Sequence, residues 1–294
     1  SGPGGRVTEA DVADSPKQAP VLPRITPLAK NIAEKKGLDI ARIEGSGTLG
    51  KITKEDVMAL SRSLASHQCV PATSIPYTGM RKGIGRNMLE SLRNAAQLTC
   101  FAEVDVTEMV RLRATLRETN AKDESVKISY NDIIILAVSR ALKQHPIMNS
   151  THAGDEIVLY EAVNMGIAVA IPDGLIVPVL KDADKKGLVR IARESRELAA
   201  KARSGTLSPD DVTGGTFTIS NTSMIAVDGF TPILRSPETG ILGVGRAKLK
   251  PAEHKGEIAL RWMMWLSLTY NHCAVDGAPA HAFLATVGGY LQNP

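Results

Sequence analysis

His272 stands in a sequence context that could position an imidazole for proton transfer. The residues before it are apolar and strand-like, and Asp276 and Gly277 follow it in the pattern His-x-x-x-Asp-Gly. This pattern predicts an imidazole at the end of a strand, held by a tight glycine turn, with a carboxylate four residues further on. An imidazole held in this way can act as a general base, because histidine changes protonation state near neutral pH.

The elements that would position His272 follow from the hydrophobic pattern along the chain. Residues 258–270 read as the strand before it, and an apolar segment runs from 278 to 291. Upstream, the pattern predicts helices at 84–92, 107–118, 129–143 and 188–204, and strands at 98–106, 157–160, 165–171, 175–179 and 216–220. This mixture is typical of an α+β sandwich, in which helices flank one mixed sheet.

Length and composition exclude several classes of protein. The chain has 294 residues, which is enough for a large core and more than one domain. Its net charge of +4 is spread along the chain, so we expect no nucleic-acid partner. No apolar run approaches the roughly 18 residues that span a membrane, so we expect no membrane partner. The cysteines, Cys69, Cys100 and Cys273, are too few and too scattered for a disulfide framework, which favours a reducing compartment.

Several blocks of sequence accompany the His272 motif. They are GMRKGIGRNM at 79–88, EVDVT at 103–107, GGTFTISN at 214–221, FTPI at 230–233 and GILGVG at 240–245. Together with the motif, these blocks resemble the E2 (dihydrolipoamide acyltransferase) chains of 2-oxo-acid dehydrogenase complexes, whose catalytic domains have a chloramphenicol-acetyltransferase-like fold. The resemblance implies such a domain, a sandwich of mixed sheet and helices, over residues 76–294.

The resemblance implies transfer of an acyl group from acyl-dihydrolipoamide to coenzyme A. His272 would take the proton from the attacking thiol, because a thiol of pKa about 8.5 is mostly protonated at neutral pH. Ser220 would stabilise the tetrahedral oxyanion, an effect worth roughly 3 kcal/mol, and would meet His272 across a trimer interface. Asp276 would orient the loop through a buried arginine pair costing roughly 3–5 kcal/mol to break. Arg86 is the first candidate for that arginine and Arg81 the second.

The chain departs from the family pattern beside both candidate catalytic residues. Asn271 and Cys273 flank His272 where Asp and Arg are usual, and Asn221-Thr-Ser-Met replaces the commoner Asn-Leu-Gly-Met. The hydrogen bonds of the His272 loop must therefore differ from the usual arrangement, which leaves rate and substrate preference open. The block around residue 230 resembles acetyl-, acetoin- or branched-chain-type E2 chains more than succinyl-type ones.

An internal repeat organises the N-terminal part of the chain. Residues 1–12 align with residues 46–57, with six of twelve positions identical. We therefore expect the chain to begin inside a module whose C-terminal remnant is residues 1–13. A linker at 14–23, a complete module at 24–62 and a second linker at 63–75 follow in sequence.

The complete module is predicted to be a small two-helix domain. Thr26 and Pro27 form an N-cap and N1 pair that opens a helix, Gly37 ends it, and a second helix follows the cap residue Thr53. This resembles the peripheral subunit-binding domain of E2 chains, which holds the E3 (dihydrolipoamide dehydrogenase) or E1 subunit. Lys30 and Lys51 stand at two positions where that family usually has arginine.

The resemblance extends to partners. Arg6 keeps an arginine in the partial repeat, whereas lysine cannot reproduce the bidentate fork that arginine makes with a carboxylate. The implied partners are the E1 decarboxylase, the E3 dehydrogenase and further copies of the chain, as trimers that build a cubic or icosahedral core. The lipoyl group would be carried by a domain outside this segment. The implied location is the cytoplasm of a bacterium or the mitochondrial matrix of a eukaryote.

Two local patterns invite other interpretations. Residues 45–50 match G-x-G-x-x-G, but a helix rather than a strand precedes them, so we expect no dinucleotide site. His272, Cys273 and Asp276 could suggest a metal, but adjacent strand residues point to opposite faces, and we expect no metal.

Two rival functions remain open. A catalytically weak or inactive E2-like core that anchors E1 or E3 is favoured slightly by Cys273, whereas retention of His272, Asp276 and Ser220 favours activity. A free-standing acyltransferase that acts on a small hydroxyl or amine acceptor would need no subunit-binding module, so the N-terminal modules argue against it.

Overall fold

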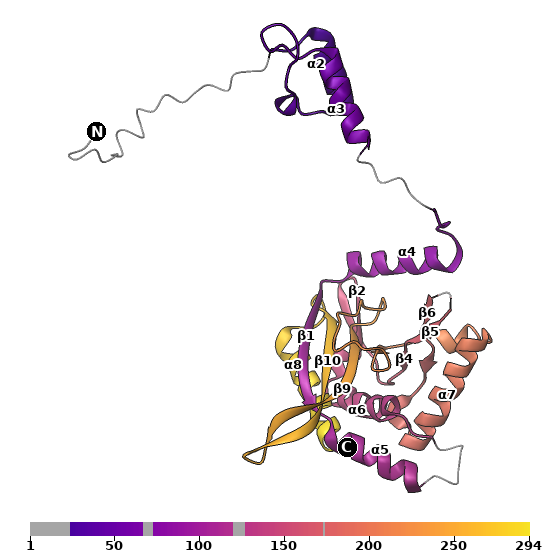
Figure 1. Ribbon diagram of the computed structural model, residues 1–294. Coiled ribbons are helices and arrows are strands. Elements are labelled where there is room, and N and C mark those ends of the chain that lie inside the picture. The colour runs from indigo at the N-terminus through magenta and orange to yellow at the C-terminus, as the bar shows by residue number, and fades with distance from the viewer. Residues whose placement is uncertain (1–23, 67–72, 120–126, 173) are drawn as a thin grey trace, which may run out of the picture. The chain divides into compact units, whose positions relative to one another are not determined.

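The computed structural model describes residues 24–66, 73–119, 127–172 and 174–294, which fall into two compact units, Ser1–Pro76 and Tyr77–Pro294 (Figure 1). The expected module remnant at 1–13, the linker at 14–23 and Arg6 lie outside the described residues.

The small unit contains α2 (Pro27–Lys36), the 3-10 turn η1 (Ile40–Arg42) and α3 (Lys54–Ser66). The predicted start and end of α2 are confirmed, because the Thr26 hydroxyl accepts a hydrogen bond from the Ala29 amide at 3.3 Å and Gly37 ends the helix at φ 63°. α3 runs four residues beyond the predicted domain boundary at 62. The core consists of the buried side chains Ala29, Ala33, Ile43, Ile52 and Val57.

One carboxylate joins the loop of the small unit to α3. Asp56 accepts hydrogen bonds from the amide and hydroxyl of Ser46 at 3.1 and 2.6 Å and from the Thr53 amide at 2.8 Å. These bonds hold the pKa of Asp56 well below its usual range. Gly45, which precedes Ser46, has no room for a side chain, since a Cβ on it would lie 2.3 Å from the Gly50 carbonyl oxygen.

The large unit is built on a six-stranded mixed sheet in the order β1-β10-β9-β8-β4-β7. β8 pairs in parallel with β9 and β4, and the other pairs are antiparallel. Two hairpins, β2–β3 and β5–β6, complete the strands and confirm the α+β expectation. The bounds are β1 Gln97–Asp105, β2 Ser150–Ala153, β3 Glu156–Leu159, β4 Met165–Ile167, β5 Val169–Ile171, β6 Gly174–Ile176, β7 Val179–Leu180, β8 Phe217–Asn221, β9 Gly240–His254 and β10 Glu257–Asn271.

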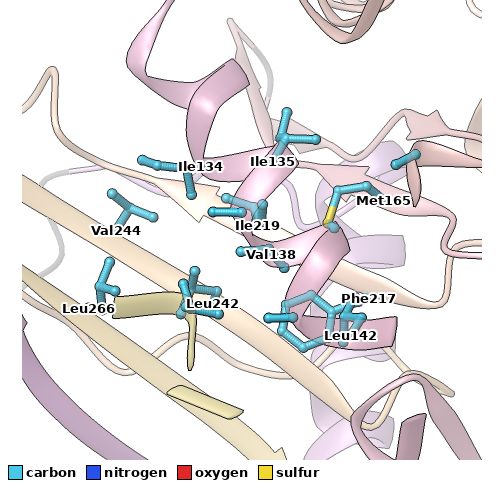
Figure 2. Close-up of a cluster of buried hydrophobic side chains, with 14 of the residues drawn as sticks. Ile134, Ile135, Val138, Leu142, Met165, Phe217, Ile219, Leu242, Val244 and Leu266 are labelled. Carbon is cyan, nitrogen blue, oxygen red and sulfur yellow. The ribbon is translucent and has the colours of Figure 1, made fainter. Parts of the chain in front are cut away.

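Helices pack against this sheet and bury its apolar side. Figure 2 shows Ile134, Ile135, Val138 and Leu142 of α6 beside apolar side chains of β4, β8, β9 and β10. The Ser129 hydroxyl and the Asp132 carboxylate cap the start of α6 reciprocally, which explains why that helix begins where the sequence predicts. The helix bounds are α4 Gly79–Asn94, α5 Thr107–Thr119, α6 Tyr130–Gln144, η2 Pro146–Met148, η3 Ala183–Lys185, α7 Leu188–Ser204, η4 Asp210–Val212 and α8 Gly277–Gln292.

Several elements differ from the expectation, among them the short strand β2, which was not expected. The predicted strand at 165–171 is two strands, because β4 pairs within the six-stranded sheet whereas β5 pairs with β6. The predicted strand at 175–179 is likewise divided between β6 and β7. The 15-residue strand β9 was not expected, since its glycines and Pro251 read against a strand.

Candidate active site

His272 lies in a turn that the backbone holds from several sides. Asn271, the last residue of β10, donates its amide to the Thr239 carbonyl at 2.9 Å. The Asn271 side-chain oxygen accepts the Cys273 amide at 3.1 Å, and the His272 amide donates to the Ala96 carbonyl at 2.8 Å. The His272 side chain keeps 40% of its surface exposed, so a fixed backbone presents an accessible imidazole.

The ring of His272 has a carboxylate and a phenol beside it. Its Nδ1 atom is 3.8 Å from the Asp276 carboxylate, which can stabilise the protonated imidazole. The ring of buried Tyr270 lies with its centroid 5.7 Å from that of His272. Burial raises the pKa of Tyr270, and the charges of Cys100 and Asp276 act in the same direction, so the phenol stays neutral near the imidazole.

The expected buried pair between Asp276 and an arginine is not formed in the described part of the chain. The Asp276 side chain is 87% exposed, and its ion-pair contact among the described residues is with His272. Arg86 and Arg81 are both exposed on α4. Asp276 is the N-cap of α8, where the helix dipole favours a negative charge that stays in contact with water.

Ser220 lies near the end of β8, half-buried and opposite Gly243 of β9. Asn221 next to it is fixed, since its side-chain oxygen accepts the Ser223 amide at 2.8 Å and its amide group donates to Asn131 at 3.1 Å. Among the described residues, the Ser220 hydroxyl has no side-chain hydrogen-bond partner. It can therefore donate to a bound group without first breaking an internal bond.

A single chain does not bring Ser220 and His272 together. Ser220 of β8 pairs with Gly243 of β9, and Gly243 pairs with Ser267 of β10. His272 follows Ser267 by five residues along the chain. At about 3.3 Å per residue and about 4.8 Å between strands, the two residues are about 20 Å apart. Because β8 and β10 run in opposite directions, their C-terminal ends point toward opposite ends of the strands in the sheet.

Two further candidate residues, predicted for subunit binding, lie in the small unit. Lys30 and Lys51 are exposed, and Lys30 lies 3.9 Å from Glu34 in an i,i+4 ion pair.

Within the described ranges, no three His, Cys, Asp or Glu side chains gather closely enough to hold a metal ion. None of the described helices has the length and apolar character needed to cross a bilayer.

Sequence reasoning missed the residues that support the turn. It treated Asn271 only as the loss of a charge, whereas the structure shows its side chain capping the backbone after β10. An asparagine at the end of a strand, next to a tight turn, is a signal for such a cap. It also passed over Glu238, a carboxylate only 4% exposed beside Thr218 of β8.

Comparison with known proteins assigns the chain to a family. The catalytic-domain model of the 2-oxoacid dehydrogenases acyltransferase family matches residues 70–294, and an E3 binding domain model matches residues 23–58. The chain belongs to the 2-oxoacid dehydrogenase acyltransferase family, that of the E2 components, and the predicted family and fold are confirmed.

Curated relatives and solved structures agree with this assignment. The chain is 40% identical to the dihydrolipoyllysine-residue acetyltransferase component of an acetoin cleaving system from Bacillus subtilis, over 92% of this chain and 69% of that protein. It is 33% identical to a Haemophilus influenzae succinyltransferase component, over 92% and 70%. A probable dihydrolipoamide acetyltransferase from Listeria monocytogenes superposes with a TM-score of 0.73 at 37% identity, over 76% and 96%.

Another solved structure bears on catalysis. Dihydrolipoamide acetyltransferase of Azotobacter vinelandii, studied for the roles of a serine, a histidine and an asparagine in its mechanism, has a TM-score of 0.73 at 34% identity over 78% of this chain and 94% of that one.

Proposed function

We propose that this chain transfers an acyl group from acyl-dihydrolipoamide to coenzyme A at a site shared by two copies. His272 of one copy removes the proton from the coenzyme A thiol, and the thiolate attacks the carbonyl carbon of the acyl thioester. Ser220 of the neighbouring copy donates a hydrogen bond to the resulting oxyanion. When the intermediate collapses, the bond to the lipoyl sulfur breaks and His272 returns the proton to that sulfur.

The separation of Ser220 and His272 supports this proposal most strongly. Each side chain is accessible, and each is placed by its neighbours rather than by a bond to the other. They cannot act on one carbonyl within one chain, because about 20 Å separates them along the strand register. A second copy would supply the missing half of each site, in line with trimers assembled into a larger core.

Substrate class and partners form the finer part of the proposal. Similarity to the acetoin-system acetyltransferase favours an acetyl-, acetoin-derived or branched-chain acyl group over succinyl. The E3 binding domain at 23–58 supports docking of dihydrolipoamide dehydrogenase, and E1 is the alternative occupant. Exposed Lys30 and Lys51 would contribute charge to that docking surface.

The first experiment measures acylation of coenzyme A by the assembled protein with acetyl-, isobutyryl- and succinyl-dihydrolipoamide. We expect turnover with one of the first two donors and a loss of about 10²–10⁴-fold in His272→Ala. His254→Ala, which removes a histidine from the far end of β9, is the matched control and should retain full activity. Folded, assembled protein that acylates coenzyme A from none of the donors would instead be a binding core.

A complementation experiment tests the shared site. Ser220→Ala and His272→Ala chains are expressed separately and together, then assayed as assembled protein. Each variant alone should be nearly inactive, whereas mixed assemblies should regain part of the activity, because some neighbours then pair an intact Ser220 with an intact His272. Mixed assemblies that stay as inactive as the single variants would rule out a site shared between copies.

A further inference from the structure

Glu238 is a buried carboxylate that the proposed mechanism does not use. It immediately precedes Thr239, and only 4% of it is exposed. Its Oε2 atom accepts a hydrogen bond from the Thr218 hydroxyl at 2.5 Å, and its Oε1 atom accepts one from the Arg235 guanidinium at 3.2 Å. Both carboxylate oxygens therefore accept a hydrogen bond from a neighbouring side chain.

The ion pair between Glu238 and Arg235 is closely packed by its surroundings. A Cβ atom on Gly215 would lie 2.7 Å from both the Arg235 guanidinium and the Glu238 carboxylate, so the pair fills space that only glycine leaves. Arg235 is anchored a second time, because its other terminal nitrogen donates to the Val212 carbonyl. The pair is thus fixed by shape as well as by charge.

The segment from Leu234 to Thr239 connects Glu238 to the turn of His272. At its far end, the Thr239 amide donates to Ser150 at 3.1 Å, and the Thr239 carbonyl accepts the Asn271 amide at 2.9 Å. At its near end, the Leu234 amide donates to the Gln97 side chain at 3.0 Å. Gln97 is itself paired with Asn271 across β1 and β10.

The same carboxylate reaches the strand of the other candidate catalytic residue. Thr218 lies on β8 two residues before Ser220, so both side chains point to one face of the sheet. One hydrogen bond therefore links Glu238 to the Ser220 strand, and one peptide unit links it to the residue that holds Asn271. The supports of both halves of the site converge on this side chain.

We propose that Glu238 is a positioning residue for acyl transfer, whose carboxylate, held by Arg235 and Thr218, fixes the strand of Ser220 relative to the turn of His272 within each chain. This inference rests on the proposed function. Since Ser220 and His272 lie about 20 Å apart and serve different sites, the carboxylate sets the geometry of both sites to which one chain contributes.

The ionisation of Glu238 supplies a readout that a purely structural role would not move. Burial raises its pKa to about 7, against the lowering effects of the Thr218 hydrogen bond and the Arg235 charge. Two other charged side chains of this region have different partners: the Lys181 ammonium donates to the Thr213 carbonyl, and the Asp211 carboxylate accepts a hydrogen bond from the Ser208 amide. His152 follows Thr151, whose backbone bridges to Glu238.

The test compares Glu238→Gln with Glu257→Gln, which makes the same change at an exposed position of β10. Coenzyme A acylation by the assembled protein is measured from pH 5.5 to 9 with the preferred acyl donor. We expect Glu238→Gln to lower kcat about tenfold while both KM values stay within twofold, because misplaced groups slow the reacting step. An ionisation near pH 7 in the kcat profile should be present in wild type and Glu257→Gln and absent in Glu238→Gln.

Each outcome decides the inference. A Glu238→Gln protein with unchanged kcat and an unchanged pH profile overturns it, as does a change in KM alone. If Glu238→Gln fails to assemble, Thr218→Val removes one donor to the carboxylate, and unchanged kcat in that variant is equally decisive. Wild-type protein without turnover removes the proposed function, and this inference with it, whereas active wild type beside unaffected Glu238→Gln removes this inference alone.

Discussion

The two units of the chain are stabilised by different kinds of contact. The small unit buries five apolar side chains and relies on polar contacts at helix ends, with Asp56 at their centre. The large unit buries a continuous apolar cluster between its sheet and helices, and within it tolerates a buried carboxylate, Glu238. A small core needs each polar contact for its fold, whereas a large core can give some stability up to hold a polar group in place.

The two carboxylates show the difference in their response to pH. Hydrogen bonds from Ser46 and Thr53 lower the pKa of Asp56, so its contribution to stability is present above its unfolded pKa and is lost on acidification. Burial raises the pKa of Glu238, so its contribution is fully present below its unfolded pKa and is lost as pH rises through about 7. Acid therefore weakens one unit through Asp56, and base weakens the other through Glu238.

The largest effect is expected from a cavity in the large core. Ile134 of α6 is fully buried, and Ile134→Ala should lower the free energy of unfolding of the large unit by about 4 kcal/mol. Denaturant unfolding of the assembled protein measures this, with Ile157→Ala, 42% exposed on β3, as the control that should cost far less. Equal costs at the two positions would contradict the assignment of this core.

The next effect concerns the buried carboxylate of the large unit. Relative to Glu238→Gln, wild-type protein should lose stability on the order of 3 kcal/mol as pH rises from about 5 to 8, because ionisation of Glu238 is opposed by burial. Denaturant midpoints of the two proteins across that pH range measure the difference. A gap that is constant with pH would mean that Glu238 does not titrate there in the folded state.

A smaller loss in the free energy of unfolding should be enough to unfold the small unit. Ile52→Ala removes the largest fully buried side chain of that core and should cost about 2 kcal/mol, since a small core can partly collapse around the gap. This is a large share of the stability of a domain of this size. Hydrogen exchange resolved by segment should show loss of protection in 24–62 only. Unchanged protection in 24–62 would contradict the view that the small unit depends on this core for its fold.

The smallest expected effect is the loss of one helix cap. Thr53→Ala removes the hydroxyl that accepts the Asp56 amide at the start of α3 and should cost about 1 kcal/mol. Segment-resolved hydrogen exchange again provides the measurement. Thr119→Ala, at the end of α5 in the large unit, is the control and should leave the small unit unaffected.

The sequence predicted those elements whose local signals agree with their packing. The start and end of α2 follow from Thr26, Pro27 and Gly37, and α6 follows from Ser129 and an apolar face. β9 escaped prediction because its glycines have a tertiary cause: a Cβ on Gly243 would lie 2.3 Å from the Ser267 hydroxyl. Such a cause depends on the neighbouring strand and leaves no local pattern.

The local structure around His272 was predictable from the sequence, whereas the contacts of the candidate site residues were not. The spacing around His272 gave a histidine at the end of a strand followed by a turn, and the structure has both. The pairing of Asp276 with Arg86 or Arg81 rested on motif position alone, and the structure leaves Asp276 exposed at the start of α8. The contact between Glu238 and Thr218 joins residues 20 positions apart through burial, which no spacing rule encodes.

The far end of β9 and β10 carries a consequence for handling the protein. Beyond Val244 and Met263 the two strands continue as a ribbon, closed by a two-residue turn at Lys255 and Gly256 with positive φ angles. Ile258 and Leu260 are 85% and 68% exposed on it. A ribbon with open edges and bare aliphatic side chains favours aggregation. Sulfate and phosphate strengthen the association of apolar surfaces, so concentrated stocks should stay clearest in buffers without these salts.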